Sequence, residues 1–192
     1  MILDAFETLL DRTPPAWLRK IETAALMGVF AKAFDVEAPG LEDLPADETL
    51  FAFREFTAAC MEAALVDEEM AATYRARLGA EAHELGRKIR TSVPMRPSSM
   101  FRLVKFFYRG IGIDLSGELP GSLKFGACSF AQRYTTGDCQ LMAAFDEGFM
   151  CGAMGVEGAL RFKCRLTEGA SCCCASFGTE SEEPESPDSV QA

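Results

Sequence analysis

Three stretches between residues 13 and 93 repeat apolar positions every three or four residues, as amphipathic helices do. The first opens with Thr13 as N-cap and prolines in its first turn, and its apolar stripe comprises Trp17, Ile21, Ala24, Ala25, Gly28 and Val29. The second begins near Glu48. The third begins near Asp67, with acids at its positive end, and ends near Val93-Pro94. These patterns predict a mainly helical region over residues 1–97.

The pattern changes after Pro97. Residues 100–108 are predicted to form a short amphipathic helix, residues 115–121 a loop and residues 122–130 a strand. A helix over 139–154 with Asp138 as N-cap follows, and then strands over 159–166 and 171–177 joined by a short loop with Gly169. We therefore predict an α+β fold, in which N-terminal helices pack with a small antiparallel sheet and a helix of the C-terminal half.

Three regions follow from these patterns. The helical region 1–97 and a cysteine-rich α+β region over 98–177 are expected to form one domain, because 192 residues with 48% hydrophobic content suit one substantial core. Residues 178–192 alternate acids with serines and two prolines and lack a hydrophobic pattern. We expect this acidic tail to be disordered.

Charge and hydropathy limit the localisation and the partners that we expect for this protein. The first seven residues have no basic segment, and no apolar run approaches the roughly 18 residues of a membrane-spanning helix. We expect a soluble cytoplasmic protein with no membrane partner, whose thiols stay free or bind metal. A net charge of −10 opposes binding to nucleic acid. Homo-oligomer formation is left open.

Residues 85–113 form a basic segment, with seven Lys and Arg and no Asp or Glu. It could hold a carboxylate or another small anion. It could equally be the solvated side of two helices that face acidic partners elsewhere in the chain. His83, the lone histidine, precedes it and has two similar interpretations, as a general base or as an exposed helix residue.

Cysteines are the main candidates for chemistry, because seven of the eight lie between Cys128 and Cys174. Cys60 is predicted to be a core residue, since it shares a helical face with aromatics and alanines. Each of the other seven has two interpretations, a small buried residue or a functional thiol, and for Cys151 and Cys173 we expect the first. Within the run 172–174, Cys173 should alternate away from its two neighbours on a strand, so the three cannot share one site. A redox role for this run is a further alternative.

The second half resembles the L-2-amino-thiazoline-4-carboxylic acid hydrolase family over about residues 101–177. The residues that carry the resemblance are Cys128-Ser129-Phe130, Cys139 opening a helix, Phe145-Asp146-Glu147-Gly148-Phe149, Leu160-Arg161-Phe162, and Gly169 before the segment 172–177. The resemblance implies a hydrolase of the class that acts on non-peptide C–N bonds, which opens a cyclic amidine by attack at the carbon of its C–N bond. The substrate would be a small thiazoline-type carboxylate, opened to a carbamoyl-cysteine product.

That reaction needs a nucleophile at the carbon between nitrogen and sulfur, a general acid, and a cation for the substrate carboxylate. Cys128 and Cys139 are the nucleophile candidates, because a helix N-terminus lowers a thiol pKa. Asp146 follows Cys139 by two helical turns on the same face and could act as base or orienter. Burial would raise its pKa. Arg102 or Arg161 could hold the carboxylate.

The same region also resembles the ligand-binding domain of the four-vinyl-reductase type. This resemblance implies a nonenzymatic small-ligand or zinc-binding module, with Cys139, Cys164 and Cys172 as zinc ligands. Arg161 stands where that pattern has an acidic ligand, three residues before Cys164. A single Cys-x7-Cys interval is also a weaker zinc signal than paired Cys-x2-Cys knuckles. Zinc is therefore an alternative cofactor only.

Overall fold

The computed structural model describes residues 10–178 of the chain. Its helices are α2 (Ala16–Phe34), α3 (Ala46–Ala64), α4 (Glu68–Ser92), α5 (Pro97–Gly110) and α6 (Thr136–Met154). Its strands are β1 (Ile113–Gly117), β2 (Gly121–Cys128), β3 (Ala159–Cys164) and β4 (Cys173–Gly178), and a short 3₁₀ turn, η1 (Leu166–Glu168), connects the last two. The predicted α+β fold is confirmed.

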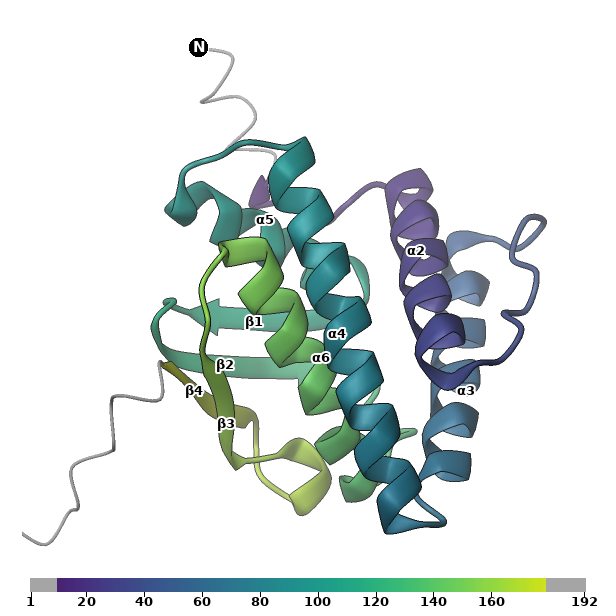
Figure 1. Ribbon diagram of the computed structural model, residues 1–192. Coiled ribbons are helices and arrows are strands. Elements are labelled where there is room, and N and C mark those ends of the chain that lie inside the picture. The colour runs from purple at the N-terminus through teal and green to yellow at the C-terminus, as the bar shows by residue number, and fades with distance from the viewer. Residues whose placement is uncertain (1–9, 179–192) are drawn as a thin grey trace, which may run out of the picture.

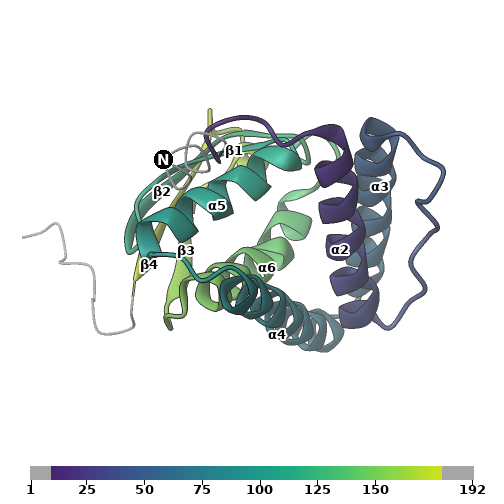
Figure 2. The ribbon, with the colours of Figure 1, turned by 90° about the horizontal axis from the view of Figure 1, so that it is seen from above.

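The four strands form one antiparallel sheet in the order β1-β2-β4-β3. The sheet and α5 lie on one side of the molecule, and α2 and α3 stand together on the other (Figure 2). Helices α4 and α6 pack against each other and connect these two sides (Figure 1). One large hydrophobic cluster draws residues from all of these layers, so the helices and the sheet share a common core. A smaller cluster joins Leu10 to α5.

Two local predictions in the second half need correction. Ile113 and Leu115 are buried, alternate with exposed neighbours and pair with β2. Residues 113–117 therefore form an edge strand, β1, which includes the first three residues of the predicted loop. Helix α6 begins three residues earlier than predicted, because Thr135 is the N-cap and Asp138 completes a capping box with it. Gly178 belongs to β4, and the rest of the predicted tail, 179–192, lies outside the described residues, as do residues 1–9.

Helix α2 buries a different face from the one its apolar stripe predicts. Trp17 and Ile21 are 65% and 59% exposed, whereas Phe30 is completely buried. The face against the core comprises Thr23, Leu26, Met27, Val29, Phe30, Ala33 and Phe34. Apolar residues occur all round this helix, so the periodicity alone could not select the buried face. Thr13 makes no cap, and the N-cap position is Pro15.

The predictions for two cysteines in the core are confirmed. Cys60 on α3 and Cys151 on α6 are each 8% exposed. Burial raises the pKa of the Cys60 thiol to about 11. The Cys151 thiol donates to the carbonyl oxygen of Gly158 at 3.3 Å. Both therefore act as small core residues that keep their protons at neutral pH.

Glycines let α4 and α6 approach until their backbones touch. A Cβ on Gly86 would lie 2.6 Å from the backbone nitrogen of Ala153, and one on Gly152 would lie 2.9 Å from that of Arg87. A Cβ on Gly148 would overlap the backbone of Gly79. Real Cβ atoms do not tolerate such contacts, so this packing requires glycine on both helices. It fixes the position of α6, the helix that carries Cys139 and Asp146.

We predict that Gly152→Ala destabilises the protein, because the added methyl group must force the two helices apart. Overpacking of this kind costs about 1–3 kcal/mol. Gly28→Ala on α2 is the matched control, since no atom lies within 4 Å of a Cβ there. It should stabilise the protein by about 0.5–1 kcal/mol through helix propensity. Urea unfolding measures both changes, and equal effects of the two substitutions would contradict the close helix contact.

Candidate functional site

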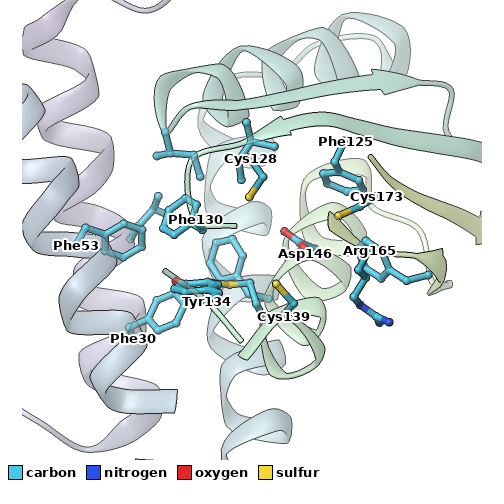
Figure 3. Close-up of a pocket in the computed structure, with 16 residues that line it drawn as sticks. Phe30, Phe53, Phe125, Cys128, Phe130, Tyr134, Cys139, Asp146, Arg165 and Cys173 are labelled. Atoms are coloured by element: carbon cyan, nitrogen blue, oxygen red, sulfur yellow. The ribbon is translucent and has the colours of Figure 1, made fainter. Parts of the chain in front are cut away.

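A cavity of about 70 Å³ lies where the sheet, α6 and the α2–α3 pair meet. One buried water needs roughly 10–15 Å³ by the same measure, so the space suits a few waters or one small molecule. Its two ends differ in chemistry (Figure 3). Aromatic rings form one end, from Phe30, Phe53, Phe130 and Tyr134, and the other end carries thiols and a carboxyl group, from Cys128, Cys139, Cys173 and Asp146.

Asp146 is the acid of this cavity and is half-buried. It projects from the middle of α6, and its Oδ1 accepts a hydrogen bond of 2.6 Å from the hydroxyl of Tyr108 on α5. Burial raises the pKa of Asp146 to about 7, although the bond from Tyr108 acts in the opposite direction. Near neutral pH the carboxyl group is therefore divided between its two protonation states. A group with this pKa can accept a proton or donate one in the physiological range.

Three elements bring thiols to this carboxyl group. Cys128 ends β2, Cys139 lies in the first turns of α6, and Cys173 begins β4. Their sulfur atoms surround the Asp146 carboxyl group (Figure 3). The structure thus places Cys128, Cys139 and Asp146, the predicted catalytic residues, on one cavity, while their roles stay a prediction.

The thiols are protonated at neutral pH. Burial raises the pKa of Cys139 to about 11, and it also raises the pKa values of Cys128 and Cys173. Asp146 adds to each of these shifts, because a negative carboxylate disfavours a second negative charge nearby. The pKa of Cys139 was expected to fall at the helix N-terminus, and burial raises it instead. A reactive thiolate would need a base beside it.

Cys173 is a cavity residue that the sequence interpretation assigned to packing. The backbone N–H of Leu166 donates to its sulfur at 3.2 Å, and Phe125 lies opposite it in the sheet. Cys172 and Cys174 do not line the cavity, and their sulfur atoms lie 3.4 Å from each other. The expected alternation of the strand is thus correct. Had the sequence also shown which face of the sheet is turned toward the core, this alternation would have placed Cys173 in the cavity.

Arg165 is the arginine in the cavity lining. Its guanidinium lies 4.7 Å from the ring of Phe162 and forms an ion pair of 3.3 Å with Glu168. Its buried Nε has no hydrogen-bond partner among residues 10–178. The guanidinium points away from Asp146 (Figure 3). Sequence reasoning missed this residue because it stands between β3 and η1, outside any expected motif.

The two arginines predicted to hold a carboxylate lie elsewhere. Arg102 projects from α5 and pairs with Asp11 at 2.8 Å near the surface. Arg161 is an exposed residue of β3. Neither side chain lines the cavity. The reason is that α5 turns the Arg102 face outward and that Arg161 alternates with the buried Leu160 on its strand.

The predicted zinc ligands do not gather in one place. Cys139 lines the cavity, whereas Cys164 and Cys172 lie outside it, with the Cys164 sulfur 3.5 Å from the carbonyl oxygen of Cys172. Among the residues that the structure describes, no group of three or more His, Cys, Asp or Glu side chains is placed to hold a metal ion. The Cys-x7-Cys interval instead spans the turn between β3 and β4.

The basic segment and His83 also lie away from the cavity. Arg87 and Lys88 pair with Glu84 one turn earlier on α4, and Arg109 donates to the carbonyl oxygens of Leu10 and Arg12. These contacts favour the interpretation as a solvated helix surface with local partners. His83 is exposed on α4, outside the residues that line the cavity.

Comparisons with known proteins return no match: neither a family model, nor a curated protein, nor a solved structure is similar to this chain. The resemblance to the thiazoline carboxylate hydrolases therefore stays a prediction, and the site is interpreted from its own geometry. In the part of the chain that the structure describes, no helix has the length and hydropathy that crossing a membrane requires.

We predict that Asp146 makes stability fall as the pH rises from 5 to 7. Its pKa in the folded protein, about 7, lies above the ordinary 3.8, so the folded state holds a proton that the unfolded chain has already released. The loss is at most about 1.4 kcal/mol per pH unit. Asp146→Asn preserves an acceptor for Tyr108 and should remove this part of the pH dependence.

Urea unfolding of the two proteins at pH 5, 6 and 7.5 measures the difference. Other titrating groups, such as Glu22 on α2, whose pKa burial raises to about 9, act in both proteins and cancel in the comparison. Parallel pH dependences of the wild type and the variant would contradict the raised pKa of Asp146.

Proposed function

We propose that this protein is a hydrolase that opens a small cyclic amidine-like carboxylate in the cavity. Asp146 transfers protons, and Cys128 or Cys139 is the nucleophile. One observation carries the proposal: a carboxyl group that burial holds at a pKa of about 7 lies among protonated thiols that need a base (Figure 3). Structural ion pairs also shift pKa values, but Asp146 has no cationic partner among the causes of its shift.

The reaction is a two-step exchange at the carbon between the ring nitrogen and the ring sulfur. In the first step the cysteine sulfur forms a bond to this carbon and the carbon–sulfur bond of the ring breaks. Asp146 moves the proton of the cysteine to the departing ring sulfur. In the second step water attacks the same carbon and the bond to the cysteine breaks, with the proton of water returning to the cysteine through Asp146. The sum is one substrate and one water converted to one carbamoyl thiol.

The lining of the cavity suits such a substrate. The rings of Phe30, Phe53 and Phe130 meet edge to face and form an apolar wall against which a flat, weakly polar heterocycle can lie with its reacting carbon toward the thiols and Asp146. A volume of about 70 Å³ limits the ligand to a small ring. Arg165 is the cationic side chain in the lining, and a carboxylate could draw its guanidinium from Glu168.

Asp146→Asn should abolish turnover of an amino-thiazoline carboxylate, with a loss of at least about 100-fold in kcat, because general acid–base catalysis contributes that much or more. In the wild type kcat/KM should rise with pH toward a plateau above about 7 as the carboxylate forms. Cys128→Ser and Cys139→Ser identify the nucleophile, since one of them should lose turnover.

Cys172→Ser is the matched control, because this thiol lies outside the cavity and should retain activity. Full activity in both the Cys128 and the Cys139 variant would exclude covalent catalysis by either residue. Absence of turnover by folded wild-type protein over a panel of cyclic amidines would remove the proposed reaction.

The second candidate is a nonenzymatic binding module for a small apolar ligand. The raised pKa values of all three cavity thiols favour it, because protonated thiols are polarisable packing groups as well as latent nucleophiles. Thermal unfolding with small aromatic heterocycles distinguishes the two candidates. A module should bind with equal affinity to the wild type and Asp146→Asn and return the ligand unchanged. Stoichiometric zinc that is lost in Cys164→Ala would instead support the metal-binding form of this alternative.

A further inference from the structure

Three thiols that do not line the cavity meet on the outer face of the sheet, and we call them the outer thiols: Cys164, Cys172 and Cys174. The sulfur atoms of Cys172 and Cys174 lie 3.4 Å apart. Cys164 pairs directly with Cys174 across β3 and β4, and its sulfur lies 3.5 Å from the carbonyl oxygen of Cys172. All three residues are half-buried. The proposed hydrolase uses none of them.

Two irregularities in the strands bring the outer thiols together. Phe162 lines the cavity, and in a regular strand the residue two positions later would point the same way. The register of β3 shifts between Phe162 and Cys164, and the extra residue turns Cys164 to the outer face beside Cys174. Cys172 lies in a bend just before β4, outside the pairing of β4 with β2 and β3. Strand pairing therefore does not fix the backbone of Cys172.

The outer thiols are separated from the cavity thiols by the alternation of β4. Cys173 stands between Cys172 and Cys174 in the sequence, and its side chain lines the cavity on the inner face. On the outer face, Lys124 of β2 is the direct cross-strand neighbour of Cys174, and it is exposed. A small water-soluble reagent can therefore reach Cys172 and Cys174 without entering the cavity.

We propose that Cys172 and Cys174 form a redox dithiol, which a small-molecule disulfide such as oxidised glutathione converts to an intramolecular disulfide. The 3.4 Å between the two sulfur atoms must shorten to about 2.0 Å, the length of an S–S bond. Residues two apart on a strand have Cα atoms about 6.4–6.8 Å apart, which is within reach of a disulfide, and the bend at Cys172 allows the remaining adjustment. The redox role considered for residues 172–174 then belongs to the first and last of them. It does not depend on the proposed hydrolase activity.

The oxidation is a thiol–disulfide exchange in two steps. In the first, the Cys172 thiolate bonds to one sulfur of the small disulfide, whose S–S bond breaks and releases one small thiolate. In the second, the Cys174 thiolate bonds to the Cys172 sulfur and displaces the other small thiolate. Each released thiolate takes up the proton that the attacking cysteine lost, so two electrons pass from the dithiol to the small disulfide, which becomes two thiols. Hydrogen bonding with Cys164 and Cys172 raises the pKa of Cys174 to about 11, so the first attack is assigned to Cys172.

Thiol counting by mass spectrometry tests the site in the full chain. The folded protein is incubated with oxidised glutathione, quenched in acid, denatured and alkylated with N-ethylmaleimide. The wild type should carry two labels fewer than the eight of the reduced protein. After trypsin, the peptide that follows Arg165 should contain the disulfide and one label, while Cys164 is labelled in a separate peptide.

Variants identify the two sulfur atoms. Cys164→Ser and Cys173→Ser are the matched controls, and each should still lose two labels. The double variants Cys164→Ser/Cys172→Ser and Cys164→Ser/Cys174→Ser should form no disulfide, because each lacks one member of the dithiol and the neighbouring thiol that could replace it.

Three results would overturn the proposal. The first is a wild type that keeps all eight labels, or that stops at a stable glutathione adduct, in millimolar oxidised glutathione. The second is a tryptic product in which Cys164 is linked to the peptide after Arg165, because Cys164 would then be the partner. The third is an unchanged loss of two labels in both double variants, because the disulfide would then form among the cavity thiols.

Discussion

The close contact of α4 with α6 is the constraint on which the rest of the structure depends. Glycines on both helices, Gly79 and Gly86 on α4 and Gly148 and Gly152 on α6, let the backbones touch. Helix α6 lies between α4 and the sheet (Figure 2). Its residues Cys139 and Asp146 line the cavity, on the side of the helix opposite the glycines that touch α4. A looser contact would move both groups relative to the strands that supply the other two thiols.

Burial then determines the chemistry of that cavity. Desolvation raises the pKa of Asp146 to about 7 and keeps the thiols protonated. The same environment therefore gives an acid that exchanges its proton near neutral pH and thiols that become nucleophiles only when a base removes their protons. The same physical effect operates at Glu22 on α2, whose buried Oε2 has no hydrogen-bond partner among the described residues. Tyr108 on α5 is tied to the same cavity, since its hydroxyl group donates a hydrogen bond to Asp146.

Periodicity predicted much of this fold, because long amphipathic helices and a short antiparallel hairpin leave strong patterns. It failed on α2, where apolar residues surround the helix, and Trp17 and Ile21 proved to be exposed. Helical spacing placed Cys139 and Asp146 on one side, and the structure brings Cys128 to them from β2. Cys173 and Arg165 come from a strand start and a turn, and their positions depend on sheet register and long-range packing, which local spacing does not encode.

The central claim is that Asp146 exchanges a proton near neutral pH inside a cavity of thiols. A carbon-13 NMR titration of the aspartate side-chain carboxyl groups tests it without any substrate, and Asp146→Asn assigns the resonance by its disappearance. The account predicts a midpoint near pH 7 for this resonance. A midpoint close to the ordinary aspartate pKa of 3.8 would contradict it.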